Sequence, residues 1–287
     1  MIDRKIVYRY LDSFKRDLKT KTGRQTFTLY GSQILALLLG VVTGMINTRV
    51  LGPEGYGILA FYVSVTSFIV LFFRFGFFSS AGLLLAQCKE EKKERELTGA
   101  TILLGLLIGL SYSIFIFGFS FFVDGIFHTN VGWILRYTSI MLIALPFNFV
   151  IVQVGRGTNK ISRMSIFKVV PKILYVIGAL LLLKIVEVQP FHFIVLYVCT
   201  ILLSALVVGY SFRPLFGNLK GNLRALWEKN KEYGIHLYFG NIADQSTYQL
   251  DRILITYFIN TTQVGFYTLA MAVTSPMAGL SQALSIS

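Results

Sequence analysis

The sequence predicts an all-α integral membrane protein, and three observations lead to this prediction. Of the 287 residues, 54% are apolar and only 14% are charged, and the mean hydropathy is +0.65. This is too apolar for a soluble domain with a wetted surface. Apolar runs of about 20 residues recur along the chain, and each can cross a hydrocarbon core of ~30 Å as a helix. These runs lack the alternation of β-barrel strands.

Eight such runs are predicted as spans, at roughly 27–50, 57–87, 98–123, 131–155, 165–186, 191–211, 233–258 and 265–287. The first run lacks a signal-peptide cleavage site, so we expect it to be retained as a span. The two cysteines have no paired spacing, which indicates neither a disulfide framework nor a zinc site. Histidine pairs at metal-ligand spacing, a Walker loop and a G-x-S-x-G elbow are all missing from the sequence. It therefore predicts no metal, no cofactor and no catalytic residue.

The basic residues that give the net charge of +13 are concentrated in alternate loops. The segments 1–26, 88–97, 156–164 and 212–232 hold 20 of the 27 basic residues, whereas the alternate connections hold only Arg49 and Lys184. This alternation is typical of the positive-inside rule and predicts a multi-pass protein of a bacterial-type inner membrane with a cytoplasmic N-terminus. The charge thus indicates topology and anionic lipid headgroups, and it argues against a nucleic-acid partner.

The order of spans predicts two parallel-related six-helix bundles. We expect a cytoplasmic amphipathic segment at 1–26, with a disordered basic tail as the alternative, then a first bundle at 27–211 and a cytoplasmic linker at 212–232. Residues 233–287 would be the first two helices of a second bundle, truncated here, so we expect the sequence to be a fragment of a parent with about twelve or more spans. A repeated phrase supports this plan, because NTRVLGPEGYGILAFY and INTTQVGFYTLAMAVT align with Gly55 on Gly265 and Tyr56 on Phe266.

Two predicted spans carry polar faces at helical spacing. In the seventh span this face contains Asn241, Asp244, Gln245, Tyr248, Asp251 and Arg252. In the first span a face of small and polar residues contains Gln33, Ala36, Gly40, Thr43, Gly44 and Asn47. Polar groups at membrane depth normally face a cavity or a partner helix. If the two halves are related as repeats, the two faces would meet across a pseudo-twofold axis. Membrane transporters built from two repeats bind substrate at this interface.

Three stretches together resemble the Wzx-type polysaccharide flippases of the multidrug/oligosaccharidyl-lipid/polysaccharide exporter superfamily. They are RVLGPEGYG, RFGFFSSAGLLLA and LDRILITYFINTTQVGFYTLA. The resemblance implies a V-shaped pair of bundles that turns a polyprenyl-diphosphate-linked oligosaccharide from the inner to the outer leaflet by alternating access, in O-antigen or capsule biosynthesis. Membrane lipids, a coupling proton or sodium ion and a polysaccharide polymerase machinery would be its partners. This sequence has Arg74-Phe75-Gly76 where relatives carry an acidic residue before the glycine, which speaks against an acidic ion site there.

Sugars and diphosphate cannot cross hydrocarbon without polar partners, so a flippase needs a hydrated and partly cationic groove. Arg74 and Arg252 are candidates to bind diphosphate by bidentate hydrogen bonds, with snorkelling or internal pairing as the alternative. Lys168 and Lys172, around Pro171, are candidates to admit an anionic headgroup. Asp244 is the candidate for ion coupling, and a structural hydrogen bond is its alternative role. We expect the other substrate contacts from Asn241, Gln245, Tyr248, Asp251, Gln33 and Asn47.

Two other functions fit parts of the sequence. A drug or cation antiporter of the same superfamily would favour carboxylates over arginines in its cavity, and here Asp244 and Asp251 balance Arg74 and Arg252. A membrane-embedded glycosyl- or acyltransferase would need an acid/base cluster on a substantial loop, and the loops are short. We therefore expect a transporter rather than an enzyme. The sugar, the coupling ion and the oligomeric state are not indicated by the sequence.

Overall fold

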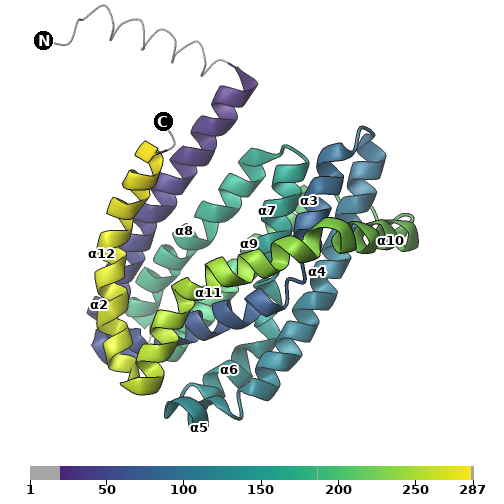
Figure 1. The fold of residues 1–287 in the computed structure, drawn as a ribbon. Coiled ribbons are helices and arrows are strands. Elements are labelled where there is room, and N and C mark those ends of the chain that lie inside the picture. The colour runs from purple at the N-terminus through teal and green to yellow at the C-terminus, as the bar shows by residue number, and fades with distance from the viewer. Residues whose placement is uncertain (1–19, 186, 286–287) are drawn as a thin grey trace, which may run out of the picture.

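The computed structural model describes residues 20–185 and 187–285, and within them the chain is all α-helical, without a strand. This confirms the predicted all-α class, and the arrangement as two parallel-related six-helix bundles stays a prediction. The predicted amphipathic segment 1–26 lies mostly outside the described residues, and so do the side chains at 21, 22, 248, 273 and 275–285. The helices shown in Figure 1 are α2 (Lys21–Phe72), α3 (Phe77–Gln87), α4 (Glu91–Phe119), α5 (Val123–Phe127), α6 (Gly132–Thr138), η1 (Ser139–Ala144), α7 (Phe147–Gly157), α8 (Ile161–Ile185), α9 (Pro190–Ser211), α10 (Leu219–Lys229), η2 (Asn230–Gly234), α11 (Ile235–Phe258) and α12 (Thr261–Ser285).

The long helix α2 is two helices joined by a sharp turn at Gly52. Gly52 has φ 68° and ψ 178°, a backbone conformation that glycine adopts without the steric cost of a Cβ. Pro53 then begins the second half of α2, where a fixed φ and a missing N–H are tolerated. The turn lies between the first two predicted spans, at 27–50 and 57–87. Below, the side of the bundle that holds this turn is called the turn side, and the side where α2 begins is called the N-terminal side.

The second predicted span is interrupted, although the sequence predicts one helix over 57–87. The second half of α2 ends at Phe72, and α3 begins only after an irregular stretch at 73–76. Within this stretch, Phe75 (φ 47°) and Gly76 (φ 79°) adopt left-handed conformations. We call residues 73–76 the helix break.

Two carbonyl groups, one within the helix break and one just before it, accept hydrogen bonds from side chains that lie far away in the sequence. The Asn230 side-chain amide donates to the Phe75 carbonyl at 2.9 Å, and the Tyr238 hydroxyl donates to the Phe72 carbonyl at 2.8 Å. Irregular backbone at membrane depth is tolerated only where protein or enclosed water satisfies it. The π-turn η2, through Asn230, and the beginning of α11, through Tyr238, therefore stabilise an interruption that the local sequence does not specify.

Five described segments are long and apolar enough to cross a membrane: Gly23–Phe72, Glu91–Phe119, Gly132–Gly157, Ile161–Ile185 and Pro190–Ser211. The first of them holds two crossings, because it contains the turn at Gly52. The seventh predicted span forms α11, whose polar face excludes it from this apolar set, and the eighth forms α12. The chain is thus a multi-pass membrane protein.

The two copies of the repeated phrase lie against each other at the turn side. α12 runs antiparallel beside the first half of α2 (Figure 1). A methyl group at Gly57 would overlap the carbonyl of Thr261, and a methyl group at Gly265 would overlap the carbonyl of Pro53. The contact is reciprocal, as a twofold relation requires. The spatial partner of Gly265 is therefore Gly57, whereas the sequence alignment pairs it with Gly55.

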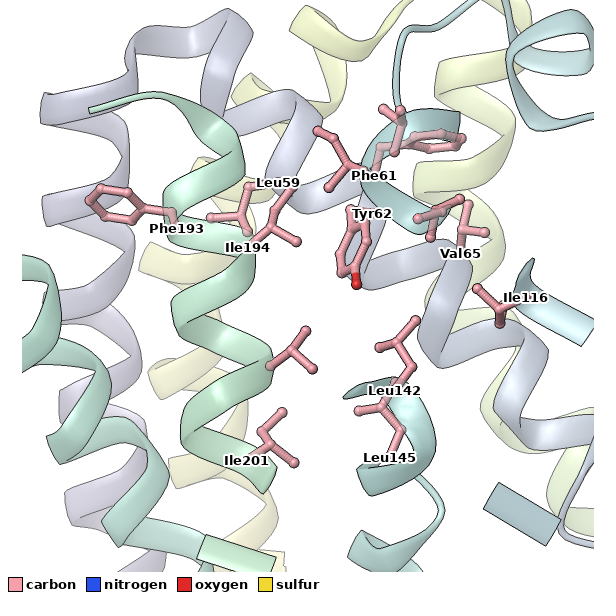
Figure 2. Close-up of a cluster of buried hydrophobic side chains, with 14 of the residues drawn as sticks. Leu59, Phe61, Tyr62, Val65, Ile116, Leu142, Leu145, Phe193, Ile194 and Ile201 are labelled. Carbon is pink, nitrogen blue, oxygen red and sulfur yellow. The ribbon is translucent and has the colours of Figure 1, made fainter. Parts of the chain in front are cut away.

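A large core joins the second half of α2 to α4, η1 and α9. Figure 2 shows Tyr62, Leu142, Phe193 and Ile194 in this cluster, and all four side chains are buried. Buried tyrosines bring apolar area but need a partner for the hydroxyl. The Tyr62 hydroxyl shares a hydrogen bond of 2.7 Å with the Thr138 hydroxyl, so this polar group is satisfied within the core.

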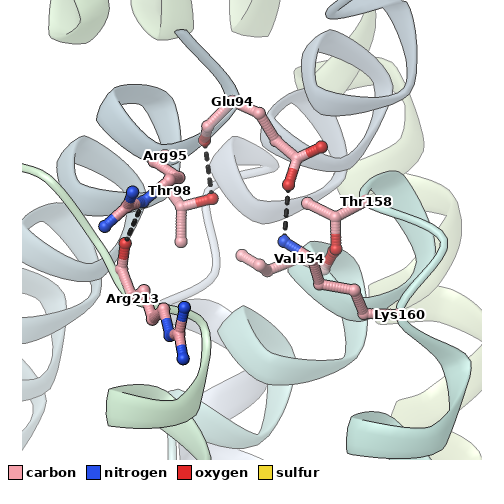
Figure 3. Close-up of polar contacts among 7 residues, drawn as sticks. All are labelled: Glu94, Arg95, Thr98, Val154, Thr158, Lys160 and Arg213. Atoms are coloured by element: carbon pink, nitrogen blue, oxygen red, sulfur yellow. Dashed lines mark hydrogen bonds and ion pairs between the residues drawn. The ribbon is translucent and has the colours of Figure 1, made fainter. Parts of the chain in front are cut away.

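Polar contacts tie the helix ends together at the N-terminal side (Figure 3). Lys160 and Glu94 form an ion pair of 2.6 Å between α4 and the turn before α8. The Arg95 side chain donates to the Arg213 carbonyl at 2.9 Å, and the Leu215 N–H donates to the Arg95 carbonyl at 2.9 Å. The segment predicted as a linker is therefore fastened to α4, and it contains helix α10 and the π-turn η2.

The hydrogen bond from Asn230 to the Phe75 carbonyl in the helix break yields a stability prediction. Asn230 is buried, so Asn230→Ala leaves the Phe75 carbonyl without its partner, which costs about 1–3 kcal/mol. We expect a lower melting temperature in detergent, measured by intrinsic fluorescence. The exposed Asn130 provides the matched control, Asn130→Ala, for which we expect no shift. An unchanged melting temperature for Asn230→Ala would show that this hydrogen bond does not stabilise the fold.

Candidate functional site

A cavity lies beside the helix break. It has a volume of about 530 Å³ and is enclosed by the end of α2, α3, α7, α8, α9 and α11. Its charged lining residues are Arg74, Arg156, Lys168 and Lys172, and no described carboxylate lines it. We call it the cationic cavity. Four positive charges without a neighbouring acid make a strong attractive potential for an anion.

Arg74 lies in the helix break, and its guanidinium is held over an aromatic ring. The Cζ atom is 3.3 Å from the centroid of the Phe149 ring, a close cation–π contact. The Nε atom is buried and has no hydrogen-bond partner among the described residues. A buried donor without a partner is costly, so this position favours a ligand with acceptor oxygens.

α8 contributes two lysines one turn apart, on either side of Pro171. Lys168 lines the cationic cavity, and Lys172 lines both it and a neighbouring cavity. The Lys172 ammonium group donates to the Ala36 carbonyl in the first half of α2 at 2.6 Å. The two helices α2 and α8 are therefore joined by a polar contact inside the membrane-spanning region.

The neighbouring cavity has a volume of about 210 Å³ and is lined by three tyrosines, Tyr56, Tyr175 and Tyr197. We call it the tyrosine cavity. Arg252 of α11 lines it, and the Arg252 Nε atom is buried with no hydrogen-bond partner among the described residues. Asn47 also lines it and accepts a hydrogen bond of 2.9 Å from the Tyr175 hydroxyl. Aromatic rings with hydroxyl and amide groups suit a polar ligand that also has apolar faces.

The chain matches a known protein family over most of its length. Residues 22–284 match the family described as Polysaccharide biosynthesis protein. The chain belongs to this family. The resemblance found in the sequence is thereby confirmed at the level of this family. No curated protein matches it.

A solved structure shares the fold of this polysaccharide biosynthesis protein. It is the MATE multidrug transporter DinF-BH, solved in complex with a ligand, with a TM-score of 0.67 and 14% sequence identity. The similarity covers 91% of this chain and 63% of the transporter, so this chain spans less than two thirds of that transporter's length. At this identity the similarity establishes the fold alone.

Five of the predicted site residues of this polysaccharide biosynthesis protein line the two cavities. Arg74, Asn241 and Gln245 line the cationic cavity, and Asn47 and Arg252 line the tyrosine cavity. The helical spacing of the polar face on α11 therefore places part of that face against both cavities. The binding roles of these residues stay predictions.

The other predicted site residues lie elsewhere. Gln33 and Asp244 are exposed and line neither cavity. Asp251 is also exposed, and its carboxylate accepts a hydrogen bond of 2.8 Å from the Tyr267 hydroxyl. The Tyr248 side chain lies outside the described part. The ion-coupling role of Asp244 therefore stays a prediction without a cavity to support it.

Two kinds of residue line the cavities although they were not predicted from the sequence as site residues. Arg156 appears in the sequence as one more loop cation, although it lines the cationic cavity from the end of α7. Tyr175 and Tyr197 lie on strongly apolar helices, where aromatic residues are most often core. The described residues hold no group of three metal-ligating side chains. In the described part, cations, amides and tyrosines thus supply the chemistry of this site.

Proposed function

We propose that this transporter is a flippase for a polyprenyl-diphosphate-linked oligosaccharide, moving it from the inner to the outer leaflet by alternating access. The observation that carries the proposal is the cationic cavity, where Arg74, Arg156, Lys168 and Lys172 face one space that no described carboxylate neutralises. Diphosphate oxygens are the acceptors that arginine and lysine bind most strongly. The adjoining tyrosine cavity suits the sugar, and the lipid tail stays in the bilayer.

The direction of transport follows from the charge distribution. The described basic segments 88–97, 156–164 and 212–232 lie on the N-terminal side, so the positive-inside rule makes this side cytoplasmic, in a bacterial-type inner membrane. The contact between Gly57 and Gly265 then closes the outer side, and the cationic cavity takes its cargo from the cytoplasmic leaflet. A proton or sodium gradient would drive the cycle, and a polysaccharide polymerase would use the product.

The main alternative is export of a cationic drug, since the similar solved structure is a multidrug transporter. An organic cation would be repelled by the four cations of the cationic cavity. A transferase would need a nucleophile paired with a base there, and no described carboxylate or histidine lines the cavity beside Ser79 or the lysines to serve as that base. The lining therefore favours an anionic cargo that is moved without chemical change.

The proposal is tested by reconstituting the full-length protein in vesicles with a fluorescent polyprenyl-diphosphate glycan. We expect leaflet exchange of this lipid to exceed that of protein-free vesicles, and we expect no gain for the same glycan on an uncharged polyprenyl ether. A matched assay follows uptake of a cationic dye. Dye transport without glycolipid exchange would replace the flippase with the drug transporter, and a chemically altered glycolipid would indicate a transferase.

A further inference from the structure

We propose that Lys172 is the residue through which cargo binding loosens α8 from α2. The inference rests on the proposed function, because it takes the cargo to be anionic. Lys172 lines both the cationic cavity and the tyrosine cavity, and its ammonium group binds the Ala36 carbonyl of α2. The same charge thus faces the space for the cargo and holds the neighbouring helix.

The contact with α2 depends on small residues on that helix. Ala36 and Gly40 lie one turn apart, and a Cβ built at Gly40 would lie 3.5 Å from the Lys172 Nζ atom. Larger side chains at these two positions would keep the ammonium group away from the backbone. The face of small residues recognised in the first span therefore receives a lysine from α8 in this structure.

The Ala36 carbonyl is a weak partner for a buried ammonium group. It is a neutral acceptor in the middle of a helix, where it also serves the backbone hydrogen-bond ladder. Phosphate oxygens carry charge, so they add a Coulomb attraction to the ammonium group that a neutral carbonyl lacks. Lys172 forms no ion pair with a described carboxylate, so no described acid competes with a phosphate for it.

The other cations of the cationic cavity do not make this contact. The Arg74 guanidinium is held over the Phe149 ring, and Lys168 lines the cationic cavity but not the tyrosine cavity. Lys172 alone among the four has a described hydrogen bond to the first half of α2. An anion that draws Lys172 into the cavity therefore releases Ala36.

The consequence is a coupling between binding and conformation. With the cavity empty, the Lys172 contact favours the state in which α2 and α8 lie together. With an anion bound, this state loses the contact, and the equilibrium shifts towards separation of the two helices at the N-terminal side. A ligand can shift such an equilibrium only through interactions that differ between the two states, and the Lys172 contact is one that differs.

The test measures the distance between α2 and α8 by spin labelling, with inorganic pyrophosphate as the probe of the diphosphate group. Labels are attached at Leu35→Cys and Ile166→Cys, both exposed positions, in a background in which Cys88 and Cys199 are replaced by serine. In the otherwise unchanged protein we expect pyrophosphate to lengthen the distance. In Lys172→Met we expect the longer distance without pyrophosphate and no further change on adding it.

Two variants separate the proposed role from a merely structural one. Lys172→Arg keeps the charge and should keep the response to pyrophosphate. Lys168→Met should weaken pyrophosphate binding about tenfold, measured by calorimetry, because it removes one charge-assisted contact. It should leave the distance of the empty protein unchanged.

The outcomes distinguish this inference from the proposed function. Pyrophosphate binding without any change in distance, or an unchanged distance in Lys172→Met, would overturn the role of Lys172 alone. Failure of pyrophosphate to bind the unaltered protein would overturn the anionic site, and this inference with it.

Discussion

Arg74→Ala is expected to lower leaflet exchange of the diphosphate-linked glycan about 10- to 150-fold. The guanidinium lies in the cationic cavity with a buried Nε atom that has no described partner, and in the proposed function the cargo supplies its acceptor. Loss of a hydrogen bond to a charged group costs about 1.5–3 kcal/mol, which corresponds to this range. The measurement is the initial exchange rate in proteoliposomes at matched protein content.

Two variants serve as controls for this prediction. Arg74→Lys keeps the charge but loses the planar fork, so an intermediate rate is expected. Arg136 also packs on an aromatic ring, with its Cζ atom 3.9 Å from the Phe121 centroid, but it is exposed and lines neither cavity. Arg136→Ala should therefore exchange the glycan at the unaltered rate. Equal losses in Arg74→Ala and Arg136→Ala would show that Arg74 acts on folding rather than on the cargo.

Gly57→Val is expected to reduce exchange to the level of protein-free vesicles. A side chain at Gly57 overlaps the Thr261 backbone carbonyl, which cannot move as the tip of a flexible side chain could. The variant should therefore hold α12 away from α2 at the turn side and remove the closed state from the transport cycle. Exchange is measured as above, and opening is measured as faster reaction of Val264→Cys, a fully buried position next to Gly265, with a membrane-impermeant maleimide.

Gly118 is the matched control for Gly57, because nothing lies within 4 Å of a Cβ built there. Gly118→Val should change neither exchange nor labelling of Val264→Cys. Normal exchange in Gly57→Val would show that the close approach of the two phrases is dispensable for transport.

Much of the helical architecture follows from local sequence, because apolar runs of spanning length form helices regardless of their neighbours. The turn at Gly52 is also local, since Gly-Pro specifies both an unusual φ and a helix start. The helix break could not be predicted in the same way. The Phe75 carbonyl within it and the Phe72 carbonyl just before it bind Asn230 and Tyr238, which follow 155 and 166 residues later, so nothing near Arg74 marks the interruption.

In the candidate site, too, some residues could be predicted from local sequence and others could not. Helical spacing on α11 places Asn241 and Gln245 at the cationic cavity, as expected from one helix face. The sequence alignment of the repeat and the packing in the structure differ by two residues. Similar side chains align Gly55 with Gly265, whereas the close backbone contact pairs Gly57 with Gly265. Lys172 illustrates the limit most clearly, because its bond to Ala36 depends on how α8 packs against α2.

The central claim is that the cationic cavity receives the diphosphate headgroup of a lipid-linked oligosaccharide. The most direct measurement places the photo-crosslinking residue p-benzoylphenylalanine at Val152, which lines this cavity, and at Ile140, which is exposed on the outside of η1. After illumination in vesicles that contain the polyprenyl-diphosphate glycan among ordinary phospholipids, mass spectrometry identifies the captured lipid. We expect the glycolipid at position 152 and only phospholipid at position 140. Capture of phospholipid alone at both positions would contradict the claim.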